Sequence, residues 1–494
     1  MKHLVVLLCL FPSLSLSAQQ RFTGMIYDPP SLRTIPYKAT LTTESYKNMP
    51  SAASVEKFCP VPGDQGQYGT CVAFATAYHL RTILYVKLQS EIAGAGGSAV
   101  NPNANIFSPS FIYEQIKNNN DRKCQDGTNP VDAFELMKTT GVAKLITQPY
   151  NCGIAIKNEA KKEGINFRIS DYQILYTTSE TDDKLKINAT KKALSEGYPC
   201  MLGFIVAESF YTVKTDIWRE LKTDDGPTGK HGRHAMCVVG YDDKKYGGAF
   251  RIMNSWGTSW ADKGFVWIPY ADFAKYSLMV IQAYGPPKPQ PKPNPVKPDE
   301  SIIDVSLKGV VRFQLNTGEA MNAMRVLTRN LEVADNLPVY KEELVAYKMD
   351  KSYSSGTRFR FMITTNTESF IYAFATDLSG KVNKILPFAD NMSPHIGSNS
   401  TVAFPSETKV VKMDNNPGTD YLLILYSKER LDAGDMLAKM NAVQGGLSKK
   451  INAALGDKVT LPSDITYHLN DIGFDVKQQH KGTVVPLMVE ITHQ

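Results

Sequence analysis

The first half of the chain is predicted to be helical because its apolar residues are either continuous or spaced at helical intervals. From Cys71 to about Leu88 nearly every face is apolar, which predicts a buried helix. Ser108-Pro109 is typical of the cap and first residue of a helix over residues 110–117. A third helix is expected at Pro130–Thr139, and the Gly-, Ser- and Asn-rich segment Gln89–Asn105 is expected to be a loop.

The pattern changes in the second half of this region, where short apolar stretches are bounded by Gly, Asp and Pro. Such stretches are typical of strands. Helices followed by strands predict an α+β domain with two lobes and a cleft between them. The strands are expected at Tyr198–Val206, Ala235–Tyr241, Phe250–Met253, Phe265–Ile268 and Leu278–Ala283.

A proline-rich segment separates this region from a second one. Seven prolines lie between Pro286 and Pro298, so residues 286–300 are expected to form an extended linker. Residues 301–494 alternate apolar and polar positions, which predicts a mostly β domain with a helix near Ala433–Leu447. Its strands are expected at Arg358–Thr364, Phe370–Thr376, Lys381–Leu386 and Tyr421–Tyr426, with a hairpin turn at Asp377–Gly380.

The N-terminal residues predict export. A positive start, an apolar run from Leu4 to Phe11 and small residues up to Ala18 are typical of a cleaved signal peptide over residues 1–18. No later apolar run is long enough to span a membrane, so we expect a secreted, periplasmic or cell-surface protein. Residues 19–57 are polar without a sustained period, which fits a leader or short pro-segment and equally an arm packed on the following domain.

Charge and cysteine content narrow the function classes. A net charge of +6 over 494 residues is weak and no basic run alternates with aromatic residues, so nucleic acid is not an expected partner. Seven cysteines become six when Cys9 leaves with the signal peptide. If Cys71 is a free thiol, five cysteines remain, and because five is an odd number the chain can form at most two internal disulfides.

Cys71 is the candidate nucleophile. The segment from Asp64 to Ala75 is a loop punctuated by glycines that delivers Cys71 to the first turn of the predicted helix. The partial positive charge and unpaired N–H groups of a helix N-terminus favour the thiolate. A lone cysteine in such a helix is more often a buried core residue, so the catalytic interpretation depends on a base elsewhere in the chain.

A base and an orienting amide are found downstream. His234 lies at the start of a predicted strand, and Asn254 follows it by twenty residues, with Trp256 close behind. Histidine can accept the thiol proton while an amide holds the other ring nitrogen. His231 and His234 also have the spacing of two metal ligands, but no suitably spaced third ligand accompanies them, so neither a metal nor another cofactor is expected.

These residues, in this order, resemble the papain family of cysteine peptidases. The resemblance covers about residues 55–285 and implies a papain-like peptidase domain over residues 58–285, with a helical lobe and a β-barrel-like lobe. The motifs that carry it are Gln65 with Cys71, His234-Ala235, Asn254-Ser255-Trp256-Gly257, Ser108 to Ile112, Cys124 to Gly127, and Gly264-Phe265-Val266.

The resemblance implies a role for each site residue. Cys71 corresponds to the nucleophile, His234 to the general base and acid, and Asn254 to the residue that orients His234. Gln65 corresponds to the side-chain donor of the oxyanion hole, and Trp256 to the indole that shields the His–Asn hydrogen bond. Trp256, Asp126, Gly127 and Arg233 are the expected substrate-binding residues, and polypeptides are the expected substrates.

Departures from the family pattern affect rigidity and specificity. Tyr68 replaces the half-cystine that normally ties the nucleophile loop to the Cys124 segment, so Cys124 is expected to pair with Cys152 instead. Val72 replaces a tryptophan, and Asp126 replaces one of two glycines. Arg233 precedes the histidine where the family often has Asp or Asn, and Cys200 and Cys237 fit a bridge or two buried thiols equally well.

Two functions are consistent with the sequence. The first is an exported cysteine endopeptidase, and the second is an inactive papain-like scaffold that acts as a binding or adhesion protein. Retention of all four chemical residues favours the enzyme. The last domain resembles a bacterial domain of uncharacterised function that recurs attached to enzymes, on the strand pattern of Phe370–Phe374 and Asp377–Leu386. This resemblance implies an accessory or binding role without naming a ligand, and a glycan, an envelope component or a protein is the kind of partner expected.

Overall fold

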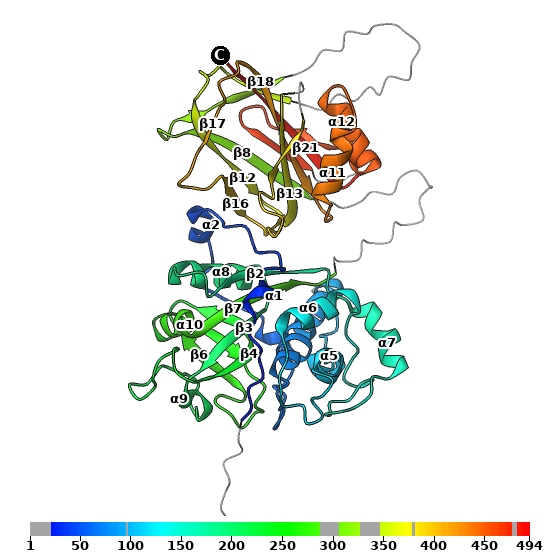
Figure 1. Cartoon of the computed structure of the whole chain (residues 1–494), viewed down its shortest axis with the longest axis vertical. Helices are drawn as coiled ribbons and strands as arrows, with labels where there is room; N and C mark the ends of the chain where they lie inside the picture. The colour runs from blue at the N-terminus through cyan, green and yellow to red at the C-terminus, as the bar shows by residue number, and fades with distance from the viewer. Residues whose placement is uncertain (1–20, 95–96, 287–305, 327–345, 378–380, 477–481) are drawn as a thin grey trace, which may run out of the picture.

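The computed structural model places the chain in two units, one above the other in Figure 1. It describes residues 21–94, 97–286, 306–326, 346–377, 381–476 and 482–494. The N-terminal unit (residues 48–286) lies below and the C-terminal unit (residues 306–494) above. The predicted signal peptide, nearly all of the predicted linker and most of the predicted turn at Asp377–Gly380 lie outside the described residues.

The N-terminal unit is built around a buried central helix that begins at Cys71. It starts as α3 (Cys71–Ala73), continues as the π-helical segment η2 (Phe74–Arg81) and ends as α4 (Thr82–Ala93). The predicted end at Leu88 was therefore too early. An ion pair of 2.9 Å between Lys87 and Glu91 spans the last turn, and pairs at this spacing support a helix.

Local capping chemistry fixes two further helices of this unit. The Ser108 hydroxyl accepts a hydrogen bond from the Phe111 N–H at the start of α5 (Pro109–Ile116). The Asn129 side chain does the same for the Val131 N–H at the start of α6 (Pro130–Thr139). Both predicted helices are confirmed. They could be predicted from the sequence because a cap and a first-turn proline are signals contained within a few residues.

A seven-stranded sheet forms the other lobe, in the order β2-β7-β3-β4-β5-β6 with β1 beside β4. All five predicted strands are present, whereas β1, β2 and four helices of this unit were not predicted. The strands are β1 (Ala52–Ser54), β2 (Asp171–Thr177), β3 (Cys200–Val206), β4 (Gly232–Asp242), β5 (Ala249–Met253), β6 (Phe265–Pro269) and β7 (Ser277–Tyr284). The remaining helices are α7 (Asn158–Gly164), α8 (Asp183–Ser195), α9 (Glu208–Tyr211) and α10 (Tyr270–Tyr276).

The C-terminal unit consists of two sheets with an apolar core between them. One sheet has the order β10-β11-β21-β18-β13-β14 with β15 beside β13, and the other has the order β16-β12-β8-β20-β19 with β17 beside β12 and β9 beside β8. The strands are β8 (Leu307–Leu315), β9 (Ala320–Met321), β10 (Ala323–Val326), β11 (Ala346–Met349), β12 (Arg358–Thr365), β13 (Ser369–Thr376), β14 (Asn383–Leu386), β15 (His395–Ile396), β16 (Ser400–Phe404), β17 (Val411–Lys412), β18 (Gly418–Ser427), β19 (Thr466–Tyr467), β20 (Ile472–Val476) and β21 (Val484–His493).

Two helices of this unit stand where one was predicted. α11 (Ala433–Asn441) and α12 (Leu447–Leu455) pack together on the outer face of the sheet that contains β13, β18 and β21. The prediction of one helix over Ala433–Leu447 was wrong because it passed through Gly445-Gly446. Gly445 has a φ of 116°, a conformation that a helix does not accommodate.

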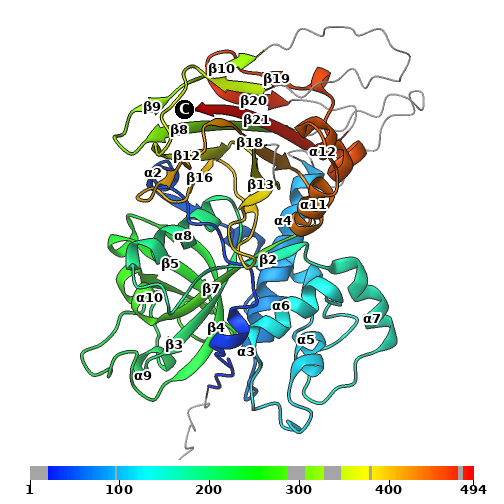
Figure 2. The same ribbon diagram turned by 45° about the horizontal axis from the view of Figure 1, so that its top comes forward.

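The N-terminal arm, residues 21–47, joins the two units. Figures 1 and 2 show it in dark blue, passing from the N-terminal unit through α1 (Pro29–Leu32) to α2 (Thr43–Lys47), which lies against the C-terminal unit. The chain then returns to the N-terminal unit, where β1 pairs with β4. The described part of residues 19–57 is packed against both units.

Candidate active site

Three elements converge on Cys71. It is the first residue of α3, His234 lies in β4, and Asn254 directly follows β5. All three side chains are fully buried. The backbone of Ala235, next to His234, lies close enough to the Cys71 thiol to lower its pKa. The fold thus brings together the predicted nucleophile and base, which lie 163 positions apart in the sequence (234 − 71).

His234 is oriented through one of its two ring nitrogens. Its Nε2 lies 2.7 Å from Oδ1 of Asn254, and the Trp256 indole stacks on the imidazole with ring centroids 4.7 Å apart. Nδ1 is buried and has no hydrogen-bond partner among the described residues. Since Asn254 occupies Nε2, Nδ1 is the nitrogen left to exchange a proton with a neighbouring group.

Burial keeps both reactive groups neutral in this conformation. It raises the pKa of Cys71 to about 11, although backbone hydrogen bonds from Ala235 and Gly24 oppose the rise. It also lowers the pKa of His234 to about 4, against the effect of the Asn254 hydrogen bond. Removing a charged form from water always favours the neutral one. A thiolate–imidazolium pair is therefore disfavoured at neutral pH while the site stays covered.

The Gln65 side chain is fixed at both of its polar atoms. Its Oε1 accepts a hydrogen bond of 2.6 Å from the Ser255 hydroxyl, and its Nε2 donates to the Tyr68 carbonyl at 2.7 Å. Nε2 also donates to the carbonyl of Phe22 in the arm at 3.1 Å. The amide is thus held with its donor directed at a carbonyl oxygen, which is what an oxyanion hole requires.

The arm covers the site by contacting both lobes. Met25 donates its N–H to the carbonyl of Arg233 at 3.0 Å, on the sheet side. On the helical side, Thr128 donates to the carbonyl of Gly24 at 2.9 Å and accepts from the N–H of Ile26 at 3.0 Å. Met25 and Ile26 therefore join the two lobes, and the Gly24 backbone lies close enough to Cys71 to affect the pKa of its thiol.

Two glycines make this close approach feasible. A Cβ on Gly127 would lie 2.2 Å from the carbonyl oxygen of Gly24, and Gly127 also has a φ of 78°. A Cβ on Gly24 would lie 2.2 Å from the carbonyl oxygen of Gly69. Neither position can carry a side chain while the arm is in place, because heavy atoms do not approach so closely.

The predicted substrate-binding residues occupy different positions around the arm. Gly127 and Trp256 contact it directly, since the Trp256 indole N–H donates to the Phe22 carbonyl at 3.3 Å. Arg233 contacts it through its backbone carbonyl, while its exposed side chain lies over the ring of Tyr27. Asp126 is exposed, and Thr128 makes the backbone pairing with the arm. Roles in substrate binding stay predictions.

Tyr150 is a site residue that the sequence did not reveal. Its hydroxyl donates to the Gln65 carbonyl at 2.9 Å and lies 2.8 Å from the Thr70 hydroxyl. Its ring packs edge-on against Phe74 with centroids 4.9 Å apart. Tyr150 thereby fastens both ends of the nucleophile loop, and no local signal distinguishes it from other tyrosines of the chain.

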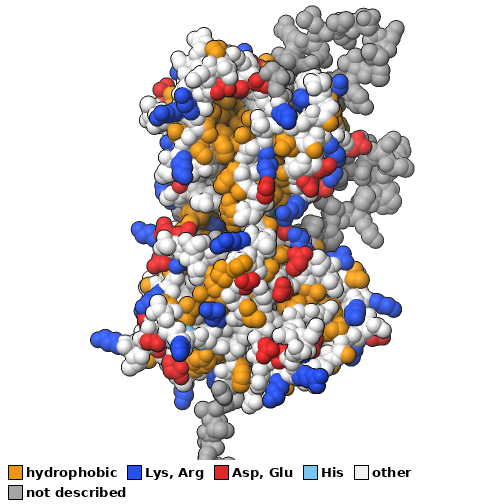
Figure 3. Space-filling view, viewed as in Figure 1, with side chains coloured by type: hydrophobic (Ala, Val, Ile, Leu, Met, Phe, Trp, Pro, Cys, Tyr) orange, Lys and Arg blue, Asp and Glu red, His pale blue; other side chains and the backbone are white. Residues whose placement is uncertain are grey.

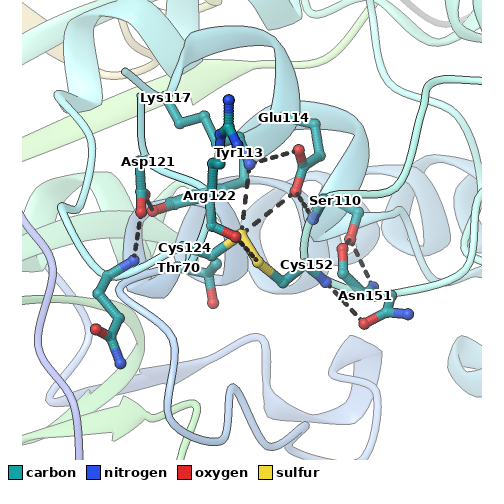
Figure 4. The surroundings of a disulfide bond; sticks show 12 residues. Thr70, Ser110, Tyr113, Glu114, Lys117, Asp121, Arg122, Cys124, Asn151 and Cys152 are labelled. Atoms are coloured by element: carbon teal, nitrogen blue, oxygen red, sulfur yellow. Dashed lines mark hydrogen bonds and ion pairs between the residues drawn. A yellow bond between two sulfur atoms is a disulfide. The ribbon is translucent and has the colours of Figure 1, made fainter. Parts of the chain in front are cut away.

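The predicted disulfide between Cys124 and Cys152 is present and supports the wall beside this loop. The bond joins the segment after α5 to the segment after Tyr150, close to Thr70 (Figure 4). Glu114 of α5 forms an ion pair of 2.7 Å with Lys117 and accepts from the Gly153 N–H at 2.8 Å. The Cys124 carbonyl in turn accepts a hydrogen bond of 2.7 Å from the N–H of Gly69.

The other cysteines that the structure describes are thiols. Cys59, Cys200 and Cys237 are unpaired, so the alternative of a bridge between Cys200 and Cys237 is not formed. Within the described residues, Glu114, Cys124 and Cys152 are the one group spaced closely enough to hold a metal, but the disulfide consumes both of its thiols. In the same described segments, no helix combines the length and the apolar character needed to cross a bilayer.

The C-terminal unit contains a largely apolar cavity that is formed by its own residues. Figure 3 shows apolar side chains gathered on the face of this unit. A cavity of about 430 Å³ is lined by aromatic and aliphatic side chains, with Asp414 and Asp420 among its polar residues. A ligand of the C-terminal unit stays a prediction. The apolar residues of the cavity include Phe359, Phe361, Ile385, Phe404, Val411 and Met413.

Family comparisons match two parts of the chain. Residues 53–279 match the family described as papain family cysteine protease. Residues 352–430 match a family described as a domain of unknown function, DUF4384. The first match contains every predicted catalytic residue, and the second lies wholly within the C-terminal unit.

Individual relatives cover about half of this chain. An uncharacterised peptidase C1-like protein of Acanthamoeba polyphaga mimivirus is 28% identical over 266 residues, 50% of this chain and 79% of that protein. Cysteine proteinase 2 of Entamoeba histolytica is 25% identical, over 51% of this chain and 76% of its own length. Xylellain, a cysteine protease from Xylella fastidiosa, is a similar solved structure with 22% identity and a TM-score of 0.41, covering 54% of this chain and 96% of that one.

Proposed function

Because residues 53–279 form a domain of the papain family of cysteine proteases, we propose that the protein is an exported endopeptidase that cleaves polypeptides. The observation that carries this proposal is the donor geometry at Gln65. Its amide already holds a peptide carbonyl, that of Phe22, in the cleft where Cys71 lies. The sequence of residues 1–18 supports export.

The mechanism follows from the position of each group. His234 Nδ1 takes the proton of the Cys71 thiol, and the sulfur attacks the carbonyl carbon of the substrate. Gln65 Nε2 and the N–H of Cys71 donate to the oxyanion of the tetrahedral intermediate. The imidazolium then protonates the leaving amine as the C–N bond breaks, which leaves a thioester on Cys71.

Hydrolysis of the thioester completes the cycle. His234 removes a proton from water, the oxygen attacks the thioester carbonyl, and the sulfur leaves as its proton is restored. Asn254 keeps the imidazole plane fixed through both halves by its 2.7 Å contact with Nε2. Trp256 covers this contact from above and keeps water from it.

The arm acts as a pro-segment in this proposal. It covers a thiol whose pKa is raised to about 11 and so prevents both substrate entry and thiolate formation. Displacement of the arm hydrates Cys71 and His234, and their pKa values return towards each other. The active form is then one in which residues 22–28 have left the cleft.

The test uses the full chain with its arm displaced. Gly24→Val places a branched side chain where even a Cβ would lie 2.2 Å from the Gly69 carbonyl oxygen, so the arm cannot seat. We expect this variant to cleave a mixed peptide library and to be labelled at Cys71 by an epoxysuccinyl reagent. The double variant Gly24→Val, Cys71→Ala is the matched control and must lose both activities. A Gly24→Val protein that is labelled but cleaves nothing contradicts the proposal and favours the inactive scaffold.

A further inference from the structure

The arm has two ends that contact different units. Residues 22–28 lie over Cys71, and residues 37–46 lie against the C-terminal unit. Between them, Leu32 and Ile35 are buried in the core of the N-terminal unit. The arm is therefore one ordered segment that spans the cleft and the junction of the two units.

The far end of the arm completes the core of the C-terminal unit. Ala39 and Leu41 are 3% and 4% exposed and belong to the apolar cluster between the two sheets of that unit. Leu41 forms a β-bridge with Val402 of β16. Burying a leucine side chain is worth about 1.5–3 kcal/mol, so this apolar contact is a substantial part of the junction.

Hydrogen bonds fix the register of this contact. Tyr37 donates its N–H to the carbonyl of Asn391 at 2.8 Å and accepts from the Ser393 N–H at 2.9 Å. Thr43 donates both its N–H and its hydroxyl to the carboxylate of Glu407, each at 2.8 Å. Charge-assisted pairs of this kind are about twice as strong as neutral ones.

Contacts between the units that do not involve the arm include one ring contact, between Tyr284 and His395 with centroids 3.9 Å apart, and several polar pairs. The Tyr198 hydroxyl donates to Glu368 at 2.5 Å, and Arg430 pairs with Asp171. Lys192 donates to the carbonyl of Ser398 at 2.8 Å. Polar pairs roughly break even against the cost of removing them from water, whereas apolar burial is a net gain. The arm adds two buried apolar side chains, Ala39 and Leu41, to this junction.

Tyr37 and Lys38 transmit the connection to the cleft. While Tyr37 pairs with Asn391 and Ser393, Lys38 donates its N–H to the carbonyl of Ile174 in β2 at 2.8 Å. Ile174 donates back to the carbonyl of Pro36 at 2.9 Å. Fixing the backbone of each residue costs about 1–2 kcal/mol of conformational entropy. Because Tyr37 and Lys38 are ordered by contacts with both units, those contacts together offset the entropy lost in ordering this one segment.

We propose that the C-terminal unit holds the arm over Cys71, so that covering of the cleft and docking of the C-terminal unit stabilise each other. The surface formed by residues 391–393, 400–404 and Glu407 is assigned as the docking site for residues 37–46 of the same chain. This inference rests on the proposed function only in treating the covered thiol as the catalytic one. Coupling between two binding events is reciprocal, so it can be measured from either end.

The first experiment weakens the far end and observes the cleft. The rate of Cys71 alkylation by iodoacetamide is measured by mass spectrometry on uncleaved full-length protein. We expect Leu41→Asp and Glu407→Ala to raise this rate about tenfold, a coupling of ordinary size. Met436→Ala is the matched control, because Met436 is a buried residue of the same unit in a core that contains no arm residue. An unchanged rate in both arm-contact variants, or an equal rise in the control, overturns the proposal.

The second experiment displaces the near end and observes the docking surface. In Gly24→Val, amide hydrogen exchange at Ser393 and Thr401 is expected to accelerate about fivefold relative to the wild type. The amide of Leu423 in β18 is the internal reference. If Cys71 of this variant is labelled rapidly while exchange at Ser393 and Thr401 stays unchanged, the two ends are independent and the proposal is wrong.

The two experiments separate this inference from the proposed function. Coupled labelling and exchange without any peptide cleavage leave the docking relationship intact and remove the endopeptidase. Cleavage by Gly24→Val without a change in exchange leaves the endopeptidase and removes the coupling.

Discussion

The side-chain amide of Gln65 donates a hydrogen bond of 3.1 Å to the carbonyl oxygen of Phe22, a residue 43 positions earlier in the chain. The arm thus occupies the amide that the proposed mechanism assigns to the substrate carbonyl. Occupation of this donor and burial of the thiol are two separate obstacles to catalysis. Both disappear when the arm leaves, whereas a substitution at Gln65 removes only the donor.

Gln65→Ala in the Gly24→Val background is expected to lower kcat by about 10²–10³-fold, because one oxyanion donor is lost. KM should change little, since the hydrogen bond strengthens mainly in the transition state. Steady-state kinetics on one peptide substrate measure both. Ser255→Ala is the companion variant and should lose less, because it frees Gln65 Oε1 without removing the donor. A change confined to KM would assign Gln65 to substrate binding.

Acid is expected to open the covered state. Burial lowers the pKa of His234 from 6.5 to about 4, so the imidazole binds a proton more readily when the arm has left. The contribution of neutral His234 to the stability of the covered state is therefore complete above pH 6.5, and it is lost as the pH falls through 4. If the open state restores the usual value, the open fraction rises roughly twentyfold between pH 7 and pH 5. Hydrogen exchange at Ile26, corrected for its intrinsic pH dependence, measures this. Exchange that is flat over this range contradicts the prediction.

Alkaline conditions are also expected to displace the arm, through deprotonation of Cys71. Burial raises the pKa of Cys71 from 9.0 to about 11, so the stabilisation from the neutral thiol is present below pH 9 and is lost as the pH rises through 11. The covered state is therefore expected to be most stable between about pH 6.5 and 9. Cys71→Ser should remove the alkaline limb of the exchange profile and leave the acidic limb.

Loss of the disulfide should destabilise the N-terminal unit without altering the chemistry. Cys124 and Cys152 are 28 residues apart, and closing a loop of that length is worth about 3–4 kcal/mol in the chain-entropy account. Cys152→Ser should lower the midpoint of thermal unfolding while kcat of the opened enzyme changes less than about threefold. A large loss of kcat with unchanged unfolding would show that the bond positions Gly69 directly.

Tyr150→Phe tests the fastening of the nucleophile loop. The substitution keeps the ring against Phe74 and removes the hydroxyl that contacts Thr70 and the Gln65 carbonyl. Each lost hydrogen bond is worth about 0.5–1.5 kcal/mol, so the unit should lose about 1–3 kcal/mol of stability. Denaturant unfolding measures this, and Tyr68→Phe, which retains the edge contact of Tyr68 with Tyr150, is the matched control.

The sequence predicted what short-range signals encode. The predicted cap Ser108 accepts from the N–H of Phe111, three residues later, and Cys71, His234 and Asn254 belong to motifs whose order is readable along the chain. The pairing of Cys124 with Cys152 followed from the resemblance once Tyr68 removed the usual partner. These features depend little on how distant segments meet.

The position of the arm could not be predicted from its residues. Its contacts with the cleft are mostly backbone hydrogen bonds, such as those of Gly24 and Ile26 with Thr128, and these leave no hydrophobic period. Leu41 contacts Val402, 361 positions away, so no local pattern indicates its burial (402 − 41). The split between α11 and α12, by contrast, has a local signal in Gly445-Gly446.

The contacts of the Tyr150 hydroxyl matter when a thiol reagent is added to keep Cys71 reduced. A thiol reagent added to protect Cys71 also attacks exposed disulfides, and the half-exposed Cys152 belongs to one. In this protein a phenol rather than a second sulfur ties Thr70 to Gln65. These two contacts contain no sulfur, so reduction of the disulfide does not itself break the link between Thr70 and Gln65.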